Sequence, residues 1–208
     1  MLGKVTQILR GYSYEQVRTV ATVLQDSSIN GMEITLNTED AFEIIRKVSC
    51  EFKGKLVVGA GTVLCYEELV KAVAAGAMFV LSPNLMTEKM LSFCKEKGII
   101  SVSGALTPSE IAEAFERGSN IVKVFPAKEF SYSYGKTVCE PLGNLKLMAV
   151  GGINLSNVNN YLDSGYQYVG TAGGIFKSED IKNENIHNLK KSLEAFEMEL
   201  GKGQHNIR

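Results

Sequence analysis

Short apolar runs recur along the chain at intervals of roughly 20 to 27 residues. Each run is too short for a helix, is rich in branched aliphatic side chains and is bounded by Gly, Pro, Ser or Asn, which is typical of buried strands. The predicted strands are Val5–Arg10, Met32–Leu36, Leu56–Ala60, Met78–Ser82, Ile99–Ser103, Ile121–Phe125, Leu147–Val150 and Tyr168–Gly170.

Most of the segments between these runs have apolar residues at helical spacing. The stretch Tyr14–Asp26 begins after Ser13, a potential N-cap, and Glu39–Val48 has a similar apolar face. Thr107 is followed by Pro, Ser and Glu, a sequence that favours a helix start. A last helix is expected over Asp180–Leu200.

Eight strands alternating with about eight helices is the element count of a (β/α)₈ TIM barrel, an α/β fold. The alternative is an open doubly wound sheet, which usually has five or six strands, so two of the eight runs would not be strands. The segment Lys128–Asn144 has the weakest helix signal. Because no linker-like stretch interrupts the chain, we expect residues 1–208 to form a single barrel domain with a short polar C-terminal tail.

Charge and composition narrow the class of partner. Lys and Arg total 22 against 23 Asp and Glu, which argues against a nucleic acid, since phosphate backbones require clustered basic surfaces. No apolar stretch approaches the ~18 residues of a membrane span, and the first residues contain no signal-peptide core. The four cysteines contain no C-x-x-C pair. We therefore expect a cytoplasmic protein with reduced thiols and a small-molecule substrate.

Lys123 stands inside an apolar strand, between Val122 and Val124. Alternation places Ile121, Lys123 and Phe125 on one face of that strand. Burial disfavours the charged form of an amine, lowers its pKa and makes the nitrogen nucleophilic towards a carbonyl carbon. A core lysine that is ion-paired or reaches solvent is the alternative explanation.

Glu33 is a second polar residue within an apolar run, and it shares a strand face with Thr35 and Asn37. A carboxyl group inside the barrel could pair with Lys123 or transfer protons as a general acid and base. A purely structural ion pair would explain Glu33 equally well. The two residues together nevertheless form the pair that a Schiff-base enzyme needs.

Glycine clusters follow three of the predicted strands, at Gly59–Thr62, Gly151–Gly152 and Gly170–Gly174. Glycine lets backbone N–H groups approach an anion, and Thr171 adds a hydroxyl group. The last two clusters lie where TIM barrels often bind phosphate. Neither cluster matches a dinucleotide-binding or P-loop motif. The alternative explanation for these glycines is that they form tight turns between a strand and the following helix.

Both histidines, His187 and His205, lie in the last part of the chain, outside the predicted strands. A metal site built on histidine ligands is therefore not expected, and histidine is not available as a general base in the barrel.

The chain resembles the 2-keto-3-deoxy-6-phosphogluconate aldolase / 4-hydroxy-2-oxoglutarate aldolase family, which consists of class I aldolases on a (β/α)₈ barrel. The resemblance covers nearly the whole chain, and its segments stand in order at the predicted strand ends. They are ILRGYS (Ile8–Ser13), MEITLNTEDA (Met32–Ala41), VVGAGTVL (Val57–Leu64), FVLSPN (Phe79–Asn84), GALTPSE (Gly104–Glu110), VKVFPA (Val122–Ala127), VGGI (Val150–Ile153) and VGTAGGIF (Val169–Phe176).

The resemblance implies roles for residues at matching positions. Lys123 matches the Schiff-base lysine, and Glu33 matches the carboxylate that shuttles protons. Thr62 matches the threonine of the family's GAGT motif, and Pro83 and Phe125 match residues that line the pyruvate end of the site.

The resemblance also implies that Gly151, Gly152, Gly170 and Thr171 form the phosphate-binding loops. A homotrimer that needs no metal or organic cofactor is expected. The implied reaction cleaves a 2-keto-3-deoxy-6-phospho sugar acid, or 4-hydroxy-2-oxoglutarate, to pyruvate and an aldehyde, either glyceraldehyde 3-phosphate or glyoxylate.

Several positions depart from the family pattern. Asn37 stands where members that act on phosphogluconate often carry an arginine that contacts the substrate carboxylate, and Arg10 is a candidate to replace it. Ser103 and Val150 replace a common proline and threonine, and Lys128–Asn144 differs from the usual loop and helix. These differences concern the substrate more than the reaction.

Two other functions stay open from the sequence. A phosphate-binding barrel isomerase or synthase would share the loops after strands seven and eight without requiring Lys123. A non-catalytic sensor of sugar-acid phosphates would keep the barrel and its ligand site but release no pyruvate.

Overall fold

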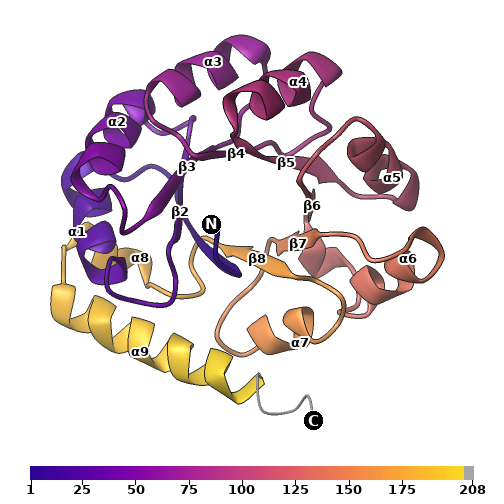
Figure 1. Ribbon diagram of the computed structural model, residues 1–208. Coiled ribbons are helices and arrows are strands. Elements are labelled where there is room, and N and C mark those ends of the chain that lie inside the picture. The colour runs from indigo at the N-terminus through magenta and orange to yellow at the C-terminus, as the bar shows by residue number, and fades with distance from the viewer. Residues whose placement is uncertain (204–208) are drawn as a thin grey trace.

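The computed structural model describes residues 1–203 of the chain, so His205 lies outside the described residues. Eight parallel strands pair in sequence order, and β1 pairs with β8, which closes the sheet into a barrel with the helices outside (Figure 1). The predicted (β/α)₈ barrel is confirmed, and the open sheet is excluded. The strands are β1 (Val5–Leu9), β2 (Gly31–Thr35), β3 (Val57–Gly61), β4 (Phe79–Leu81), β5 (Ile100–Ala105), β6 (Ile121–Val124), β7 (Leu147–Val150) and β8 (Tyr168–Thr171).

The wall of the barrel separates two groups of buried side chains. The larger group packs between strands and helices and includes Val122 and Val124. The smaller group fills the barrel interior and includes Ile121 and Met148, together with Leu2 from the segment before β1. Alternation therefore sends neighbouring residues of one strand into different environments, as the sequence pattern predicts.

The helices cover the outside of this wall. They are α1 (Tyr14–Leu24), α2 (Ala41–Glu51), α3 (Tyr66–Ala74), α4 (Glu88–Lys97), α5 (Pro108–Glu116), the 3₁₀ turn η1 (Ala127–Glu129), α6 (Tyr134–Leu142), α7 (Val158–Leu162), α8 (Ser178–Lys182) and α9 (Ile186–Gly203). The starts of α1 and α5 have the capping boxes that their sequences favour, with Ser13 and Thr107 as N-caps.

The weak segment Lys128–Asn144 contains η1 and α6, and a contact from outside the segment anchors its helix. The hydroxyl group of Tyr134 donates a hydrogen bond of 2.6 Å to the carbonyl oxygen of Leu106. Pro141 lies inside the last turn of α6. Tertiary contact thus supports a helix that local sequence favours only weakly.

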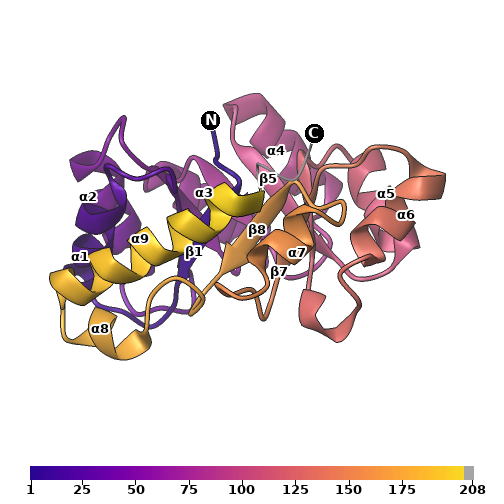
Figure 2. The ribbon, with the colours of Figure 1, turned by 90° about the horizontal axis from the view of Figure 1, so that it is seen from below.

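The prediction of one helix over Asp180–Leu200 is wrong. The structure has two helices, α8 and α9, which are separated by a turn at Glu184 with a positive φ of 51°. The side chain of Asn185 accepts a hydrogen bond of 3.1 Å from the backbone N–H of Asn188 and so helps to start the new helix. Helix α9 then runs along the outside of the barrel past α1, α7 and α8 (Figure 2).

Candidate active site

A cavity of about 640 Å³ opens at the carboxyl ends of the strands, the end where TIM barrels carry their active sites. Residues directly after β1, β2, β3, β6 and β7 line it together with inward-facing strand residues. All of the site residues that the sequence predicts lie in its wall: Arg10, Glu33, Thr62, Pro83, Lys123, Phe125, Gly151, Gly152, Gly170 and Thr171.

Lys123 extends from β6 into this cavity and is only 6% exposed. Its Nζ lies 4.7 Å from the centre of the Phe125 ring, which covers the amine from the mouth side of β6. Burial lowers the pKa of Lys123 from its ordinary value of 10.5, the charge of Arg10 lowers it further, and Glu33 opposes both effects. The amine is therefore shifted towards its neutral, nucleophilic form.

Glu33 reaches the same cavity from β2 and is 2% exposed. Burial raises the pKa of its carboxyl group, while the positive charges of Lys123 and Arg10 lower it. Within residues 1–203, Glu33 has no ion pair of 4.0 Å or less with either cation, and its buried Oε2 atom has no hydrogen-bond partner. The pair Glu33 and Lys123 is thus separated by a gap rather than locked in a salt bridge.

Arg10 and Asn37 lie at the exposed mouth of the cavity, at the ends of β1 and β2. Within the described part of the chain, the guanidinium group of Arg10 makes no ion pair or hydrogen bond. A free guanidinium group at this point can take a substrate carboxylate in a bidentate pair, which the amide of Asn37 cannot do.

Thr62 follows β3 and has a φ of 58°, in the left-handed region that β-branched residues rarely adopt. The next two residues fix this turn. The backbone N–H of Val63 donates to the carbonyl oxygen of Leu81 at 3.1 Å, and that of Leu64 donates to the Glu68 carboxylate at 2.7 Å. Strain of this kind persists where surrounding contacts determine the backbone, and here it places Thr62 in the cavity wall.

Pro83 packs over β5 at Gly104, the position where that strand has no side chain. Gly104 lies opposite Lys123 in the β5–β6 register, and a side chain there would overlap the backbone of Pro83. The N–H of Gly104 donates to the carbonyl oxygen of Asn84 at 3.0 Å. The loop after β4 thereby closes over the strand that pairs with Lys123.

The two glycine loops lie side by side and are joined by Thr171. Its hydroxyl group donates to the carbonyl oxygen of Ile153 at 2.6 Å and accepts a hydrogen bond from the N–H of Gly174 at 2.9 Å. Gly151 and Gly152 have φ values of 101° and 82°, which only glycine adopts readily. Thr171 therefore organises the loop pair, in addition to lining the cavity.

Sequence reasoning missed the asparagines that hold the first of these loops. The amide groups of Asn154 and Asn157 both donate to the carbonyl oxygen of Gly152, at 3.3 and 2.9 Å. Asn154 also lines the cavity. Asparagines shortly after a Gly-Gly pair are a turn signal that could have indicated this arrangement.

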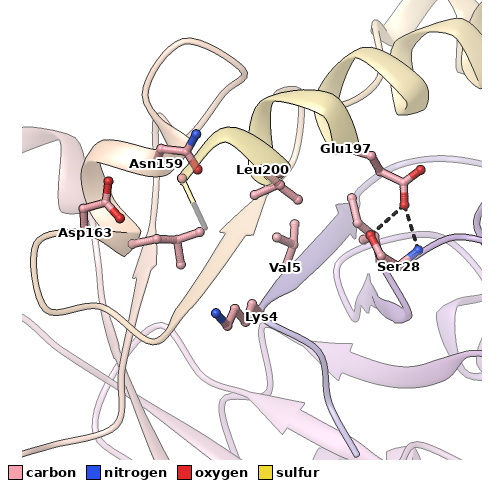
Figure 3. Close-up of a pocket in the computed structure, with 11 residues that line it drawn as sticks. Lys4, Val5, Ser28, Asn159, Asp163, Glu197 and Leu200 are labelled. Carbon is pink, nitrogen blue, oxygen red and sulfur yellow. Dashed lines mark hydrogen bonds between the residues drawn. The ribbon is translucent and has the colours of Figure 1, made fainter. Parts of the chain in front are cut away.

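A second cavity, of about 420 Å³, lies at the opposite end of the barrel beneath α9 (Figure 3). Its wall includes Lys4, Asp163 and Glu197, and the Glu197 carboxylate accepts hydrogen bonds from the backbone N–H and hydroxyl group of Ser28 at 2.7 and 2.6 Å. Those contacts attach α9 to the barrel. The buried side chains of Lys123 and Glu33 lie in the other cavity, at the carboxyl ends of the strands.

No group of three or more His, Cys, Asp or Glu side chains that could hold a metal ion is present among residues 1–203. His187 is exposed on α9, far along the chain from the strands that line the cavity. No described helix is both long and apolar enough to cross a membrane.

Comparison with known proteins identifies the family that the sequence motifs resemble, and the match covers most of the chain. Residues 1–192 match the family model of the KDPG and KHG aldolases. The 2-dehydro-3-deoxy-phosphogluconate aldolase of Dickeya dadantii is 33% identical over 161 residues, which are 77% of this chain and 75% of that protein. The KHG/KDPG aldolase of Escherichia coli K12 is 31% identical over the same shares of the two chains.

A solved structure of the KDPG aldolase from Legionella pneumophila, with pyruvate captured as a covalent carbinolamine intermediate, superposes with a TM-score of 0.82. It is 28% identical and covers 93% of this chain and 94% of its own. The resemblance stated from the sequence motifs is therefore confirmed. The chain belongs to the KDPG and KHG aldolase family, whose members are aldolases, a class of carbon–carbon lyases.

Proposed function

We propose that this chain is a class I aldolase in which Lys123 forms an imine with the C2 carbonyl carbon of a 2-oxo acid. The observation that carries the proposal is the placement of two buried ionisable groups in one cavity. Burial favours the neutral amine of Lys123 and the neutral carboxylic acid of Glu33, which are the forms that a nucleophile and a general acid require.

The reaction begins when Nζ of Lys123 attacks the carbonyl carbon and forms a carbinolamine. Glu33, acting through a water molecule across the gap between the two side chains, gives a proton to the departing hydroxyl group, and an iminium remains. The C4 hydroxyl group then gives its proton, through water, to the carboxylate that the previous step left on Glu33, and the C3–C4 bond breaks as its electron pair moves into the iminium. An aldehyde leaves, and protonation at C3 followed by hydrolysis releases pyruvate and restores Lys123.

The two ends of the substrate would meet different parts of the cavity. Arg10 and Thr62 are placed to hold the carboxylate beside Lys123. The backbone of Gly151–Gly152 and Gly170–Gly174, at the ends of β7 and β8, suits a phosphate on the aldehyde half. A 2-keto-3-deoxy-6-phospho sugar acid uses both ends and gives pyruvate and glyceraldehyde 3-phosphate.

A second candidate substrate is 4-hydroxy-2-oxoglutarate, which gives pyruvate and glyoxylate. The donation of the Thr171 hydroxyl proton to the carbonyl oxygen of Ile153 leaves one fewer donor for a phosphate group, which supports this unphosphorylated substrate. Neither reaction needs a metal or an organic cofactor. We also propose a homotrimer, on the family resemblance, which light scattering would test.

Trapping with borohydride tests the proposal. Incubation with pyruvate and borohydride should inactivate the enzyme and leave one reduced pyruvyl adduct per chain, on the peptide that contains Lys123. A barrel isomerase or synthase would give no adduct. A non-catalytic sensor would be stabilised by ligand but would release no pyruvate from either candidate substrate.

A further inference from the structure

Two glycines of β3, Gly59 and Gly61, face the barrel interior, and different groups fill the space where their side chains would lie. A Cβ atom at Gly59 would lie 2.5 Å from ring atoms of Phe79. A Cβ atom at Gly61 would overlap the carboxyl group of Glu33 and lie 2.7 Å from its Cγ atom. One glycine therefore admits a core ring, and the other admits an ionisable group of the active site.

The strand register explains why Glu33 extends towards Gly61. Glu33 lies directly opposite Gly59 in the β2–β3 pair, and Phe79 lies opposite Gly59 in the β3–β4 pair. The Phe79 ring, which is fully buried, occupies the space above Gly59. The Glu33 side chain is thus directed two residues further along β3, towards the carboxyl end of the barrel and the cavity that Lys123 lines.

Packing rather than hydrogen bonding holds the carboxyl group in this position, and the charges of Lys123 and Arg10 attract its ionised form. Within residues 1–203, Glu33 accepts no hydrogen bond and makes no ion pair, and its Oε2 atom is enclosed. A carboxyl group without directional partners takes the position that packing leaves open. For Glu33, that position is the surface of the bare backbone at Gly61.

We infer that Gly61 is a positioning residue for Glu33, because only a residue without a side chain leaves room for the carboxyl group in the cavity that Lys123 also lines. The inference rests on the proposed function, which assigns proton transfer to Glu33. It adds a reason for the second glycine of the GAGT sequence that is independent of turns and of phosphate binding.

A methyl group at position 61 should move Glu33 without unfolding the chain. The atoms in its way are the tip of a side chain that can rotate about several bonds, so Glu33 can yield. Gly59→Ala is the matched control in the same strand and on the same face. Its methyl group would meet the ring of Phe79 and not the carboxyl group, so the cost should appear more in stability than in chemistry.

The test measures the rate of reductive trapping by pyruvate and borohydride, and the pyruvate concentration for half-saturation, in the wild type and four variants. These are Gly61→Ala, Glu33→Ala, the double variant and Gly59→Ala. We expect Gly61→Ala to keep the wild-type melting temperature and half-saturation but to trap about 100-fold more slowly, as misplaced proton-transfer groups do. The double variant should trap at the rate of Glu33→Ala alone, because Gly61 acts through Glu33. Gly59→Ala should melt at a lower temperature and lose less of its trapping rate than Gly61→Ala, because its methyl group can act on Glu33 only through Phe79.

Three results would overturn the inference: wild-type trapping by Gly61→Ala, a Gly61→Ala protein that does not fold, or a double variant slower than Glu33→Ala by the full Gly61→Ala factor. Absence of trapping by the wild type would instead contradict the proposed function. Trapping of the wild type therefore distinguishes a failure of this inference from a failure of the proposed function.

Discussion

The Phe125 ring lies against the amine of Lys123, with 4.7 Å between Nζ and the ring centre. One residue, Val124, separates them in the chain. The two effects on the amine oppose each other. Burial lowers the pKa of Lys123, whereas the face of an aromatic ring stabilises an ammonium group. Phe125 is 38% exposed and covers the amine of Lys123. Its ring also favours the protonated form of that amine.

Replacing Phe125 by leucine should therefore shift the titration of Lys123. Phe125→Leu keeps an apolar cover but removes the ring and its cation–π contact with the ammonium group, so the pKa of Lys123 should fall further. The pH dependence of reductive trapping by pyruvate would report the shift. A midpoint that stays in place or rises would show that the ring does not stabilise the ammonium form.

Lys123→Met should fold, bind no pyruvate covalently and lose turnover, because a side chain of similar length without an amine occupies the same apolar space. Liquid chromatography with mass spectrometry after borohydride treatment would show the loss of the adduct. Lys71→Met, on the exposed face of α3, is the matched control and should be trapped like the wild type. An adduct on another lysine of the Lys123→Met protein would refute the assignment.

The stability of the Lys123→Met variant relative to wild type should depend on pH. The pKa of Lys123 is lowered in the folded chain, so between that value and 10.5 the unfolded chain binds more protons, and wild-type stability rises with pH. Below this window the wild type has the full cost of a buried ammonium group, which the variant lacks. The melting temperature of the variant should thus exceed that of the wild type most below this window and by less as the pH approaches 10.5. A constant difference would contradict the lowered pKa.

Arg10→Ala should raise the KM for the 2-oxo acid at least several-fold, since the variant loses the only charged partner that the described mouth residues offer to the substrate carboxylate. Steady-state pyruvate release would measure the effect. Arg46→Ala removes an exposed arginine that pairs with Glu43 on α2 and serves as the control. Unchanged kcat and KM in Arg10→Ala would remove Arg10 from the site.

Inorganic phosphate should compete with a phosphorylated substrate but not with pyruvate, if the loops at Gly151–Gly152 and Gly170–Gly174 hold a phosphate. Inhibition of aldol cleavage and of pyruvate trapping would be compared at the same phosphate concentrations. Equal activity on phosphorylated and unphosphorylated substrates, without phosphate inhibition, would favour 4-hydroxy-2-oxoglutarate.

Much of the fold could be predicted because a barrel strand has one simple pattern. Each of the eight apolar runs overlaps a strand of the structure, with ends that differ by at most two residues. The polar residues Glu33 and Lys123 were recognisable because they interrupt such runs, and both line the cavity.

Features that depend on contacts between distant residues could not be predicted in this way. The break at Glu184 requires a local backbone conformation, and α6 depends on the contact of Tyr134 with Leu106. The positive φ of Thr62 is fixed by hydrogen bonds to two other segments. The contact between Gly61 and the Glu33 carboxyl group forms only when β2 pairs with β3.

The pairing of β1 with β8 also affects how the protein can associate with other chains. Gln7 of β1 lies opposite Thr171 of β8, so the ring of backbone hydrogen bonds has no end. An open sheet presents unpaired N–H and C=O groups at its rim, onto which a foreign strand can add. Within residues 1–203 the barrel sheet has no such rim, so a foreign strand cannot extend it and another chain would contact the helices and loops instead.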